Sequence, residues 1–329
     1  MGKQDTVTKD YLKNTKVFAD AFNFFIYGGE PFIDGDKLHE MDPTAIGILQ
    51  RPDGAGIPIQ KYRDVLKCLT AMTDGNTAYL ILGIEAQSYV HYAMPVKAEL
   101  YDTLEYAGQV ERTAQKHREE MKARKNKNTT KDKMQHLTSD EYLCGFWKED
   151  RLIPVITLVI YFSPDDWDGP LSLHEMFSTQ DEKILSLVPD YKLNFISPAA
   201  MSEEEIDKFQ TSLREVMLYI KNSKDKKRLA AVVNGNDSFK SLDRKAAEVL
   251  RVLTNTNLIF SDDKEETCNM CKALDDMCAD AREDGIETAT FNGIKNIMES
   301  FGVSAEKAMT VLKVPKEDFP KYLTRLQKQ

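Results

Sequence analysis

Two strand-like runs separated by a short polar turn constrain the fold more than any other feature of the sequence. They span about Tyr62 to Leu69 and Ala78 to Gln87, and the turn between them contains Asp74-Gly75. A type I′ turn needs positive φ at both central residues, which an Asp-Gly pair tolerates well. The two runs are therefore expected to form an antiparallel hairpin.

A turn centred on Asp74-Gly75 also predicts which residues of the hairpin lie opposite each other. The resulting register places Asp64 opposite Glu85, and side chains paired in this way have Cβ atoms about 4.5–5.5 Å apart. Period-two alternation puts Gln87 on the same face as Glu85. A bulge at the glycine two residues before Glu85 would shift the register by one. We expect Asp64, Glu85 and Gln87 to project together from one edge of a small sheet.

A pair of opposed carboxylates in an otherwise apolar strand needs a cation or a shared proton to offset the repulsion between Asp64 and Glu85. Magnesium is suited to such a pair, because one or two carboxylates hold it while water and phosphate fill its other positions. The alternative is that both residues lie at solvated strand ends. Spacing alone does not decide between a metal site and solvated ends.

Further helices and strands can be predicted from the apolar periodicity. A helix is expected from about Tyr11 to the Gly28-Gly29 pair, and the Gly- and Pro-rich residues 51–58 predict a loop. A long helix is expected over roughly 94–120. Shorter strands are expected at Ile153–Phe162 and Tyr191–Ile196.

This order of elements predicts an α/β fold, with a small mixed β-sheet flanked by helices in residues 1–197 and a helical C-terminal region in residues 198–329. A mobile, lysine-rich loop is expected at about 122–136, inside the first domain. The helices of the C-terminal region are expected at Glu203–Lys221, Asp243–Leu253 and Glu265–Arg282, followed by two short ones.

The charges are distributed unevenly along the chain. The formal net charge of −9 argues against a protein that coats nucleic acid nonspecifically. Residues 112–133 nevertheless hold nine Lys or Arg against three acids, and residues 261–287 hold ten acids against three bases. The basic stretch is either a contact for DNA phosphates or a solvated loop and helix end.

Several classes of site and location are disfavoured by what the sequence lacks. Cys268, Cys271 and Cys278 form a CxxC with a third cysteine but no fourth ligand, so ordinary helix thiols are expected instead of a structural zinc site. There is no Walker A or GxGxxG motif, and hence no expected nucleotide cofactor. The sequence shows neither a signal-peptide pattern nor a membrane-spanning apolar run, which predicts a cytoplasmic protein without a membrane partner.

The order Asp64, hairpin, Glu85-Ala86-Gln87 resembles the D…ExK signature of the PD-(D/E)XK nuclease superfamily, with glutamine in place of lysine. Over most of its length the chain resembles the Rpn family (recombination-promoting nuclease, YhgA-like putative transposase). The stretches that carry this resemblance are DYLKNTKVFADAFNFFIYGGE, YRDVLK, LGIEAQSYVHYAMPVKAELYDTLEY, LIPVITLVIYFSPDDWDGPLSLHEMF, YKLNFISP and ETCNMCKALDDM.

The resemblance implies a PD-(D/E)XK, restriction-endonuclease-like core in a bacterial DNA endonuclease linked to DNA recombination or mobility, or to phage defence. Asp64 and Glu85 would then bind Mg²⁺, with Mn²⁺ as an alternative, and the Ala86 carbonyl would be a third ligand. Gln87 would orient the attacking water without supplying positive charge. Asp20 would be an additional acid, unless it is a solvated helix residue.

The predicted partner is DNA, bound with little sequence preference. Lys97 and Tyr101 lie one helical turn apart and share a face, which suits either contact with the scissile phosphate or ordinary packing and surface roles. Four more predicted phosphate contacts belong to the basic stretch: Arg112, Lys116, Arg124 and Lys125. The C-terminal helices are expected to support a homodimer. Two alternatives remain open: a catalytically inactive DNA- or partner-binding relative, and an interaction protein acting through its C-terminal helices.

Overall fold

The computed structural model describes residues 3–41, 44–50, 56–62, 64–70, 78–126, 137–256, 258–260 and 265–327. The chain forms two compact units: Met1–Thr256 with Glu266–Cys268, and Asn257–Glu265 with Asn269–Gln329. Within the described ranges, no helix is long and apolar enough to cross a membrane. The first unit extends beyond residue 197, where the sequence places the end of the α/β core.

A five-stranded mixed sheet forms the centre of the first unit, in the order β1-β4-β5-β6-β7. The first three strands of this order are antiparallel neighbours, whereas β5, β6 and β7 run parallel to one another. The strands are β1 Leu38–Glu40, β4 Val65–Thr70, β5 Ala78–Gln87, β6 Val155–Tyr161 and β7 Asn194–Ile196. The predicted α/β class with a small mixed sheet is confirmed.

The register of the β4–β5 hairpin is the one that the sequence predicts. Val65 lies opposite Ile84 and Leu66 opposite Gly83, so one further step brings Asp64 beside Glu85. The irregularity lies between Leu69 and Thr70, at the far end of the hairpin from Gly83. The predicted Asp74-Gly75 turn lies outside the described residues.

A second hairpin occupies part of the region that the sequence predicts as a loop. It pairs β2 (Thr44–Gln50) with β3 (Gly56–Tyr62) in a two-stranded antiparallel sheet. The loop prediction for 51–58 is therefore wrong from residue 56 onward. Pro58 is compatible with β3, because both strands of a two-stranded sheet are edges and proline is tolerated there.

Two helices replace the single N-terminal helix that the periodicity predicts: α1 (Lys3–Leu12) and α2 (Thr15–Tyr27). The boundary is set by Asn14, whose side chain accepts hydrogen bonds from the backbone N–H groups of Lys16 and Val17 and so caps α2. The predicted end of α2 is confirmed. Gly28 and Gly29 follow with φ of +65° and +100°, conformations that favour glycine.

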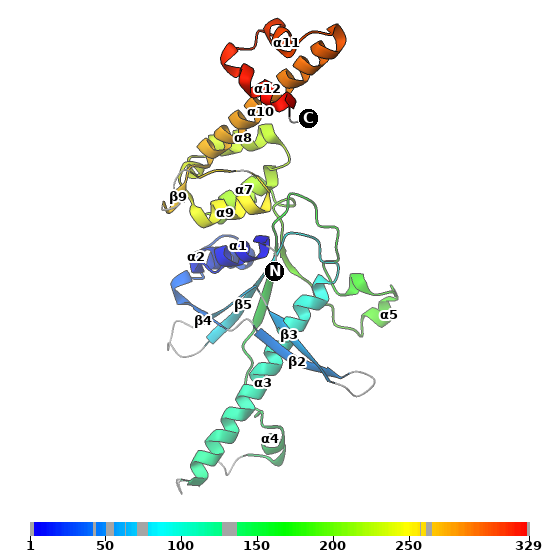
Figure 1. Ribbon diagram of the computed structural model, residues 1–329. Helices are drawn as coiled ribbons and strands as arrows, with labels where there is room; N and C mark the ends of the chain where they lie inside the picture. Colours follow the sequence, from blue (N-terminus) through cyan, green and yellow to red (C-terminus); the bar gives the residue numbers. More distant parts are fainter. Residues whose placement is uncertain are drawn as a thin grey trace. The chain divides into compact units, whose positions relative to one another are not determined.

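These N-terminal helices and the long helix α3 (Met94–Asn126) lie on opposite faces of the sheet (Figure 1). On one face, the buried side chain of Lys67 donates to the carbonyl of Lys13, directly after α1. Lys67 lies opposite Leu82 in the hairpin. Glu85 is three positions after Leu82 on β5, so its side chain points to the opposite face of the sheet. On that face, the Glu85 carboxylate pairs with Lys97 of α3. Helix α3 ends six residues beyond the predicted limit of 120.

The remaining elements of the first unit are mostly short helices. They are α4 Ser139–Cys144, α5 Glu182–Leu185, α6 Glu203–Ile206, α7 Leu213–Asn222, α8 Lys226–Gly235, α9 Arg244–Leu253, the 3-10 helices η1 Gly35–Lys37, η3 His174–Met176 and η4 Asp237–Ser241, and the paired strands β8 Leu242–Asp243 and β9 Thr267–Cys268. The prediction of a single helix over Glu203–Lys221 is wrong, because α6 and α7 are separate helices. The prediction of α9 is confirmed.

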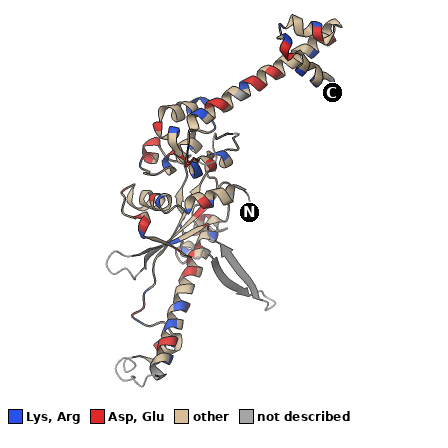
Figure 2. Ribbon diagram, turned by 60° about the vertical axis from the view of Figure 1, so that its left-hand side comes forward, with Lys and Arg blue, Asp and Glu red and all other residues tan. Residues whose placement is uncertain are grey.

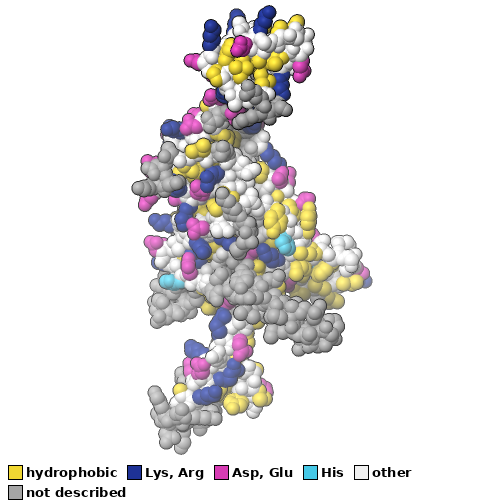
Figure 3. Space-filling model, in the orientation of Figure 1, with side chains coloured by type: hydrophobic (Ala, Val, Ile, Leu, Met, Phe, Trp, Pro, Cys, Tyr) yellow, Lys and Arg dark blue, Asp and Glu magenta, His cyan; other side chains and the backbone are white. Residues whose placement is uncertain are grey.

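Hydrophobic side chains gather over the segment of α5, where Ile184 and Leu187 are exposed (Figure 3).

The second unit is helical and has its own apolar core. It contains α10 (Met270–Phe301), α11 (Ala305–Val311), the 3-10 helix η5 (Lys316–Asp318) and α12 (Phe319–Gln327). The core residues are Phe291, Ile294, Ala308, Met309 and Tyr322. The predicted pair of short final helices is present, but the preceding helix runs to residue 301 and not to 282. Cys268, Cys271 and Cys278 are not joined in disulfides.

Candidate functional site

The structure brings Asp64 directly against the strand that carries Glu85. Asp64 stands one residue before β4, and its Oδ2 accepts a hydrogen bond from the backbone N–H of Ala86 at 2.8 Å. This contact follows from the hairpin register, since the residue opposite Asp64 is Glu85 and the next peptide belongs to Ala86. The predicted ligand atom of Ala86 was its carbonyl, whereas the contact seen here is made by its N–H.

Glu85 carries a fully buried carboxylate in a central strand of the sheet. The residue is 0% exposed, and Lys97 Nζ lies 2.7 Å from its Oε2. A buried carboxylate costs several kcal/mol when no partner offsets its lost hydration. The ammonium of Lys97, from the beginning of α3, provides that partner.

Asp64 has a lysine partner of its own, which comes from α1. Lys9 Nζ lies 2.7 Å from Asp64 Oδ1, and the two side chains are 18% and 12% exposed. Two carboxylates and two ammonium groups thus form two ion pairs with a balanced formal charge, one with α1 and one with α3, which lie on opposite faces of the sheet. Lys9 is absent from the residues singled out in the sequence, because α1 is not predicted and no motif relates residue 9 to the hairpin.

Gln87 is the last residue of β5. It is buried and borders a small cavity of about 10 Å³, close to the smallest space that holds one water molecule. The other lining residues are Gln4, Thr8, Ala86, Ser88, Phe162 and Leu253. The cavity that borders Gln87 therefore has room for about one water.

The beginning of α3 holds further polar contacts that the sequence does not reveal. Tyr101 is buried, with the Lys97 ammonium 5.9 Å from its ring centroid, a position that favours the packing role. The neighbouring Asp102 accepts hydrogen bonds from the hydroxyls of Thr157 and Tyr191, both at 2.6 Å. Asp102 thereby joins α3 to β6 and to the segment before β7.

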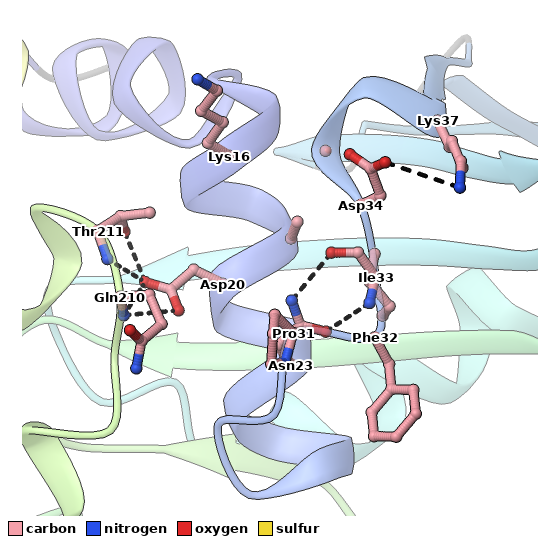
Figure 4. Close-up of a pocket in the computed structure, with 12 residues that line it drawn as sticks. Lys16, Asp20, Asn23, Pro31, Phe32, Ile33, Asp34, Lys37, Gln210 and Thr211 are labelled. Carbon is pink, nitrogen blue, oxygen red and sulfur yellow. Dashed lines mark hydrogen bonds and ion pairs between the residues drawn. The ribbon is translucent and has the colours of Figure 1, made fainter.

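Asp20 has a buried environment, which contradicts one of the two roles considered for it. It is only 4% exposed, so it is not a solvated helix residue. Its carboxylate accepts hydrogen bonds from the backbone N–H groups of Gln210 and Thr211 and from the Thr211 hydroxyl (Figure 4). It borders a cavity of about 410 Å³ whose lining contains neither Asp64 nor Glu85. Asp20 connects α2 to the segment before α7.

The part of the basic stretch that lies on α3 contains both ion-paired arginines and an exposed lysine. Arg112 is exposed but pairs with Glu105, and the nearby Arg118 pairs with Glu111. Lys116 is exposed. Lysines, arginines and acids alternate along this helix (Figure 2). The side chains of Arg124 and Lys125, and the loop residues 127–136, lie outside the described part, so a phosphate-binding role of this stretch stays a prediction.

The donor set at the hairpin agrees with a hard divalent cation. Asp64 and Glu85 offer carboxylate oxygens from opposed positions of the hairpin, each paired with a lysine, and magnesium is commonly held by one or two carboxylates with water and phosphate as the other ligands. Within the described ranges there is no cluster of three or more His, Cys, Asp or Glu residues that could enclose a metal by themselves.

No family model, curated protein or solved structure matches this chain.

Proposed function

We propose that this protein is a metal-dependent DNA endonuclease that hydrolyses phosphodiester bonds with little sequence preference. The observation that carries the proposal is the Glu85 carboxylate, fully buried in β5, with the Asp64 carboxylate bonded to the next peptide. Charges in such a place are expensive for stability and are typical of catalytic and metal sites. The mixed sheet, with both acids on one hairpin, supports a PD-(D/E)XK-like core.

Asp64 and Glu85 are the residues that would hold Mg²⁺, or Mn²⁺ in its place. A bound ion would neutralise phosphate charge and lower the pKa of an attacking water. Two carboxylates leave most positions of the ion to water and substrate, as this chemistry requires. The acids themselves would fix where the reacting phosphate lies.

Gln87 is suited to orienting the water that attacks the phosphate. Its amide offers two donor hydrogens and an acceptor oxygen, and the residue borders a cavity with room for about one water. Glutamine supplies no positive charge, so its contribution is one of geometry. The wider setting that we propose is DNA recombination, DNA mobility or phage defence in a bacterial cytoplasm, with the helices of the second unit supporting a homodimer.

The test is plasmid cleavage by the purified full chain in Mg²⁺, Mn²⁺ or EDTA. Asp64→Ala and Glu85→Ala are compared with Asp237→Ala, a control whose carboxylate is 90% exposed and pairs with Lys240 on the surface. We expect metal-dependent cutting by the wild type and by the control, and a loss of at least about 100-fold in both site variants.

Equal cutting by the wild type and by folded site variants would overturn the site assignment. An absence of cutting in every metal, together with intact DNA binding, would instead favour a catalytically inactive DNA-binding relative of the same fold.

A further inference from the structure

Helix α11 of the second unit ends in a tight turn that changes the direction of the chain. The backbone N–H of Lys313 bonds the Thr310 carbonyl at 3.1 Å, and that of Val314 bonds the Met309 carbonyl at 3.0 Å. These two bonds form a Schellman motif, which ends a helix sharply. Lys313 has the left-handed conformation that this motif requires, with φ of +56°. The chain therefore leaves α11 in a fixed direction.

A second helix begins directly after this turn. Pro315 precedes the 3-10 helix η5, and Phe319, where η5 passes into α12, is itself helical with φ of −54° and ψ of −46°. Residues 316–327 are thus one continuous helical stretch. Leu312 is still helical at the end of α11, so only residues 313–315 separate the two helices. Two helices joined by a turn of about three or four residues are the arrangement of a helix-turn-helix motif.

Both helices and the turn pack on the end of α10 (Figure 1). The shared apolar core takes Phe291 and Ile294 from α10, Ala308 and Met309 from α11, and Tyr322 from α12. The turn and α12 contribute further side chains packed against this core: Val314, Phe319, Leu323 and Leu326. The inward residues of α12 recur at helical spacing, so its opposite face points to solvent. The core thereby holds the last helix in place.

The outward face of the stretch 316–327 is polar. Its exposed residues are Lys316, Glu317, Pro320, Lys321 and Thr324. No large apolar side chain of this stretch is exposed among the described residues. The whole chain has a net charge of −9, whereas residues 302–327 hold five Lys or Arg against three acids. A polar, cation-rich helix face suits DNA better than a protein partner, because the centre of a protein–protein interface is apolar.

The cations of these two helices differ in whether an acid occupies them. Lys321 and Arg325 pair with Glu287 of α10. Three exposed lysines have no acidic partner within the described part of the chain: Lys307, Lys313 and Lys316. Lys307 lies on α11, whereas Lys316 begins the helical stretch that follows the turn. Both helices thus present an unoccupied cation to solvent.

We propose that residues 291–327 are a helix-turn-helix module that places the helix of η5 and α12 in the major groove of double-stranded DNA. The major groove is wide enough to admit an α-helix. In this docking mode the beginning of the second helix reaches base edges, and the first helix crosses the backbone. Lys316 is therefore assigned to a base edge and Lys307 to a phosphate. DNA binding by this module needs neither Asp64 nor Glu85, so it goes beyond the nuclease function proposed above.

The experiment measures DNA binding by the full chain in EDTA, where metal-dependent cutting does not interfere. Duplexes with a randomised central segment are selected by the wild type, and the selected duplex is compared with a scrambled one by fluorescence anisotropy over a series of salt concentrations. Lys316→Met and Lys307→Met are compared with Lys272→Met, a matched control at an exposed lysine on α10 outside the module. Thermal unfolding and sedimentation are recorded for each protein.

We expect the wild type to enrich one sequence. Lys316→Met should reduce the ratio of affinities for the selected and scrambled duplexes by about 10-fold or more, as for a lost base contact. Lys307→Met should weaken both duplexes equally and decrease the slope of log affinity against log salt by about 1, as for one lost phosphate contact. Lys272→Met should bind both duplexes as the wild type does.

The proposal is overturned if no sequence is enriched, or if Lys316→Met keeps the wild-type ratio of affinities. It is also overturned if Lys272→Met changes binding as much as the two module variants do. A change in sedimentation of the module variants with unchanged DNA binding would show that this face binds another copy of the chain instead. Lys316→Gln replaces Lys316→Met if the latter does not fold. A wild type that cuts no DNA in any metal refutes the nuclease proposal alone, because all of these binding measurements are made without cleavage.

Discussion

The Asp64 carboxylate accepts a hydrogen bond from the backbone N–H of Ala86, so the residue before β4 is joined to β5 directly after Glu85. This contact predicts different outcomes for two substitutions. Asp64→Ala leaves the N–H without its acceptor and should lower the free energy of unfolding by about 1–3 kcal/mol. Asp64→Asn keeps an acceptor oxygen and should cost about 1 kcal/mol or less.

Urea unfolding of the two variants checks this difference, and plasmid cleavage is measured on the same preparations. Both variants should be inactive, because an amide is a poor ligand for a hard cation compared with a carboxylate. Equal stability of Asp64→Ala and the wild type would show that the contact with Ala86 contributes nothing.

The contacts of Lys67 predict that its replacement lowers the stability of the protein without affecting the candidate site. Its side chain is fully buried, donates to the Lys13 carbonyl at 3.0 Å and lies 5.5 Å from the centroid of the Phe18 ring. Lys67→Met keeps the apolar stem but leaves a helix-end carbonyl without this donor, and should cost about 1–3 kcal/mol. Lys37→Met, at a half-exposed lysine 3.7 Å from Asp34, should cost about 0.5 kcal/mol or less.

Chemical unfolding measures both lysine variants. Cleavage per folded molecule should equal that of the wild type in each of them. A Lys67→Met protein as stable as Lys37→Met would contradict the structural role of the buried ammonium.

The hairpin that carries the site could be predicted because its signals are local. Alternation along β5 and the Asp74-Gly75 pair predict a register, and the observed pairing of Val65 with Ile84 agrees with it, which places Asp64 beside Glu85. The pairing of Glu85 with Lys97 could not be predicted in the same way. It depends on how α3 packs on the sheet, and the bonds of Asp102 to Thr157 and Tyr191 connect segments far apart in the sequence.

Two errors in the helices also have physical reasons. Apolar periodicity continues across Asn14, so one helix was predicted where a side-chain cap begins a new one. The predicted helix over 203–221 was divided for a tertiary reason. Asp20, from a distant helix, accepts the backbone N–H groups of Gln210 and Thr211 and holds this segment outside α6 and α7.

Asp20 provides a further prediction, because its hydrogen bonds indicate a structural and not a catalytic carboxylate. Asp20→Ala removes the acceptor for Gln210 and Thr211 and should lower the free energy of unfolding by about 1.5–3 kcal/mol. The metal dependence and rate of plasmid cleavage per folded molecule should not change. A stable variant that has lost cleavage would instead identify Asp20 as an additional catalytic acid.

The ion pairs of Glu287 predict a pH-dependent contact inside the second unit. Hydrogen bonding to Lys321 lowers the pKa of the Glu287 carboxyl, with a further contribution from Arg325 on the same helix, α12. A carboxyl whose pKa is lower in the folded than in the unfolded chain adds stability above the unfolded value, about 4.3 for Glu. That stability is lost as the pH falls through the folded pKa. The contact between α10 and α12 should therefore weaken in acid.

A carbon-detected NMR titration of the Glu287 carboxyl in the full chain measures this shift directly. Lys321→Met should raise the Glu287 pKa toward its ordinary value by more than Arg325→Met does, because the hydrogen bond from Lys321 is the largest cause of the lowering. Lys307→Met, at an exposed lysine on α11, is the matched control and should leave the titration unchanged. If Glu287 titrates at its ordinary value in the wild type, or if Lys307→Met moves it as far as Lys321→Met does, then α12 does not hold this carboxylate in solution.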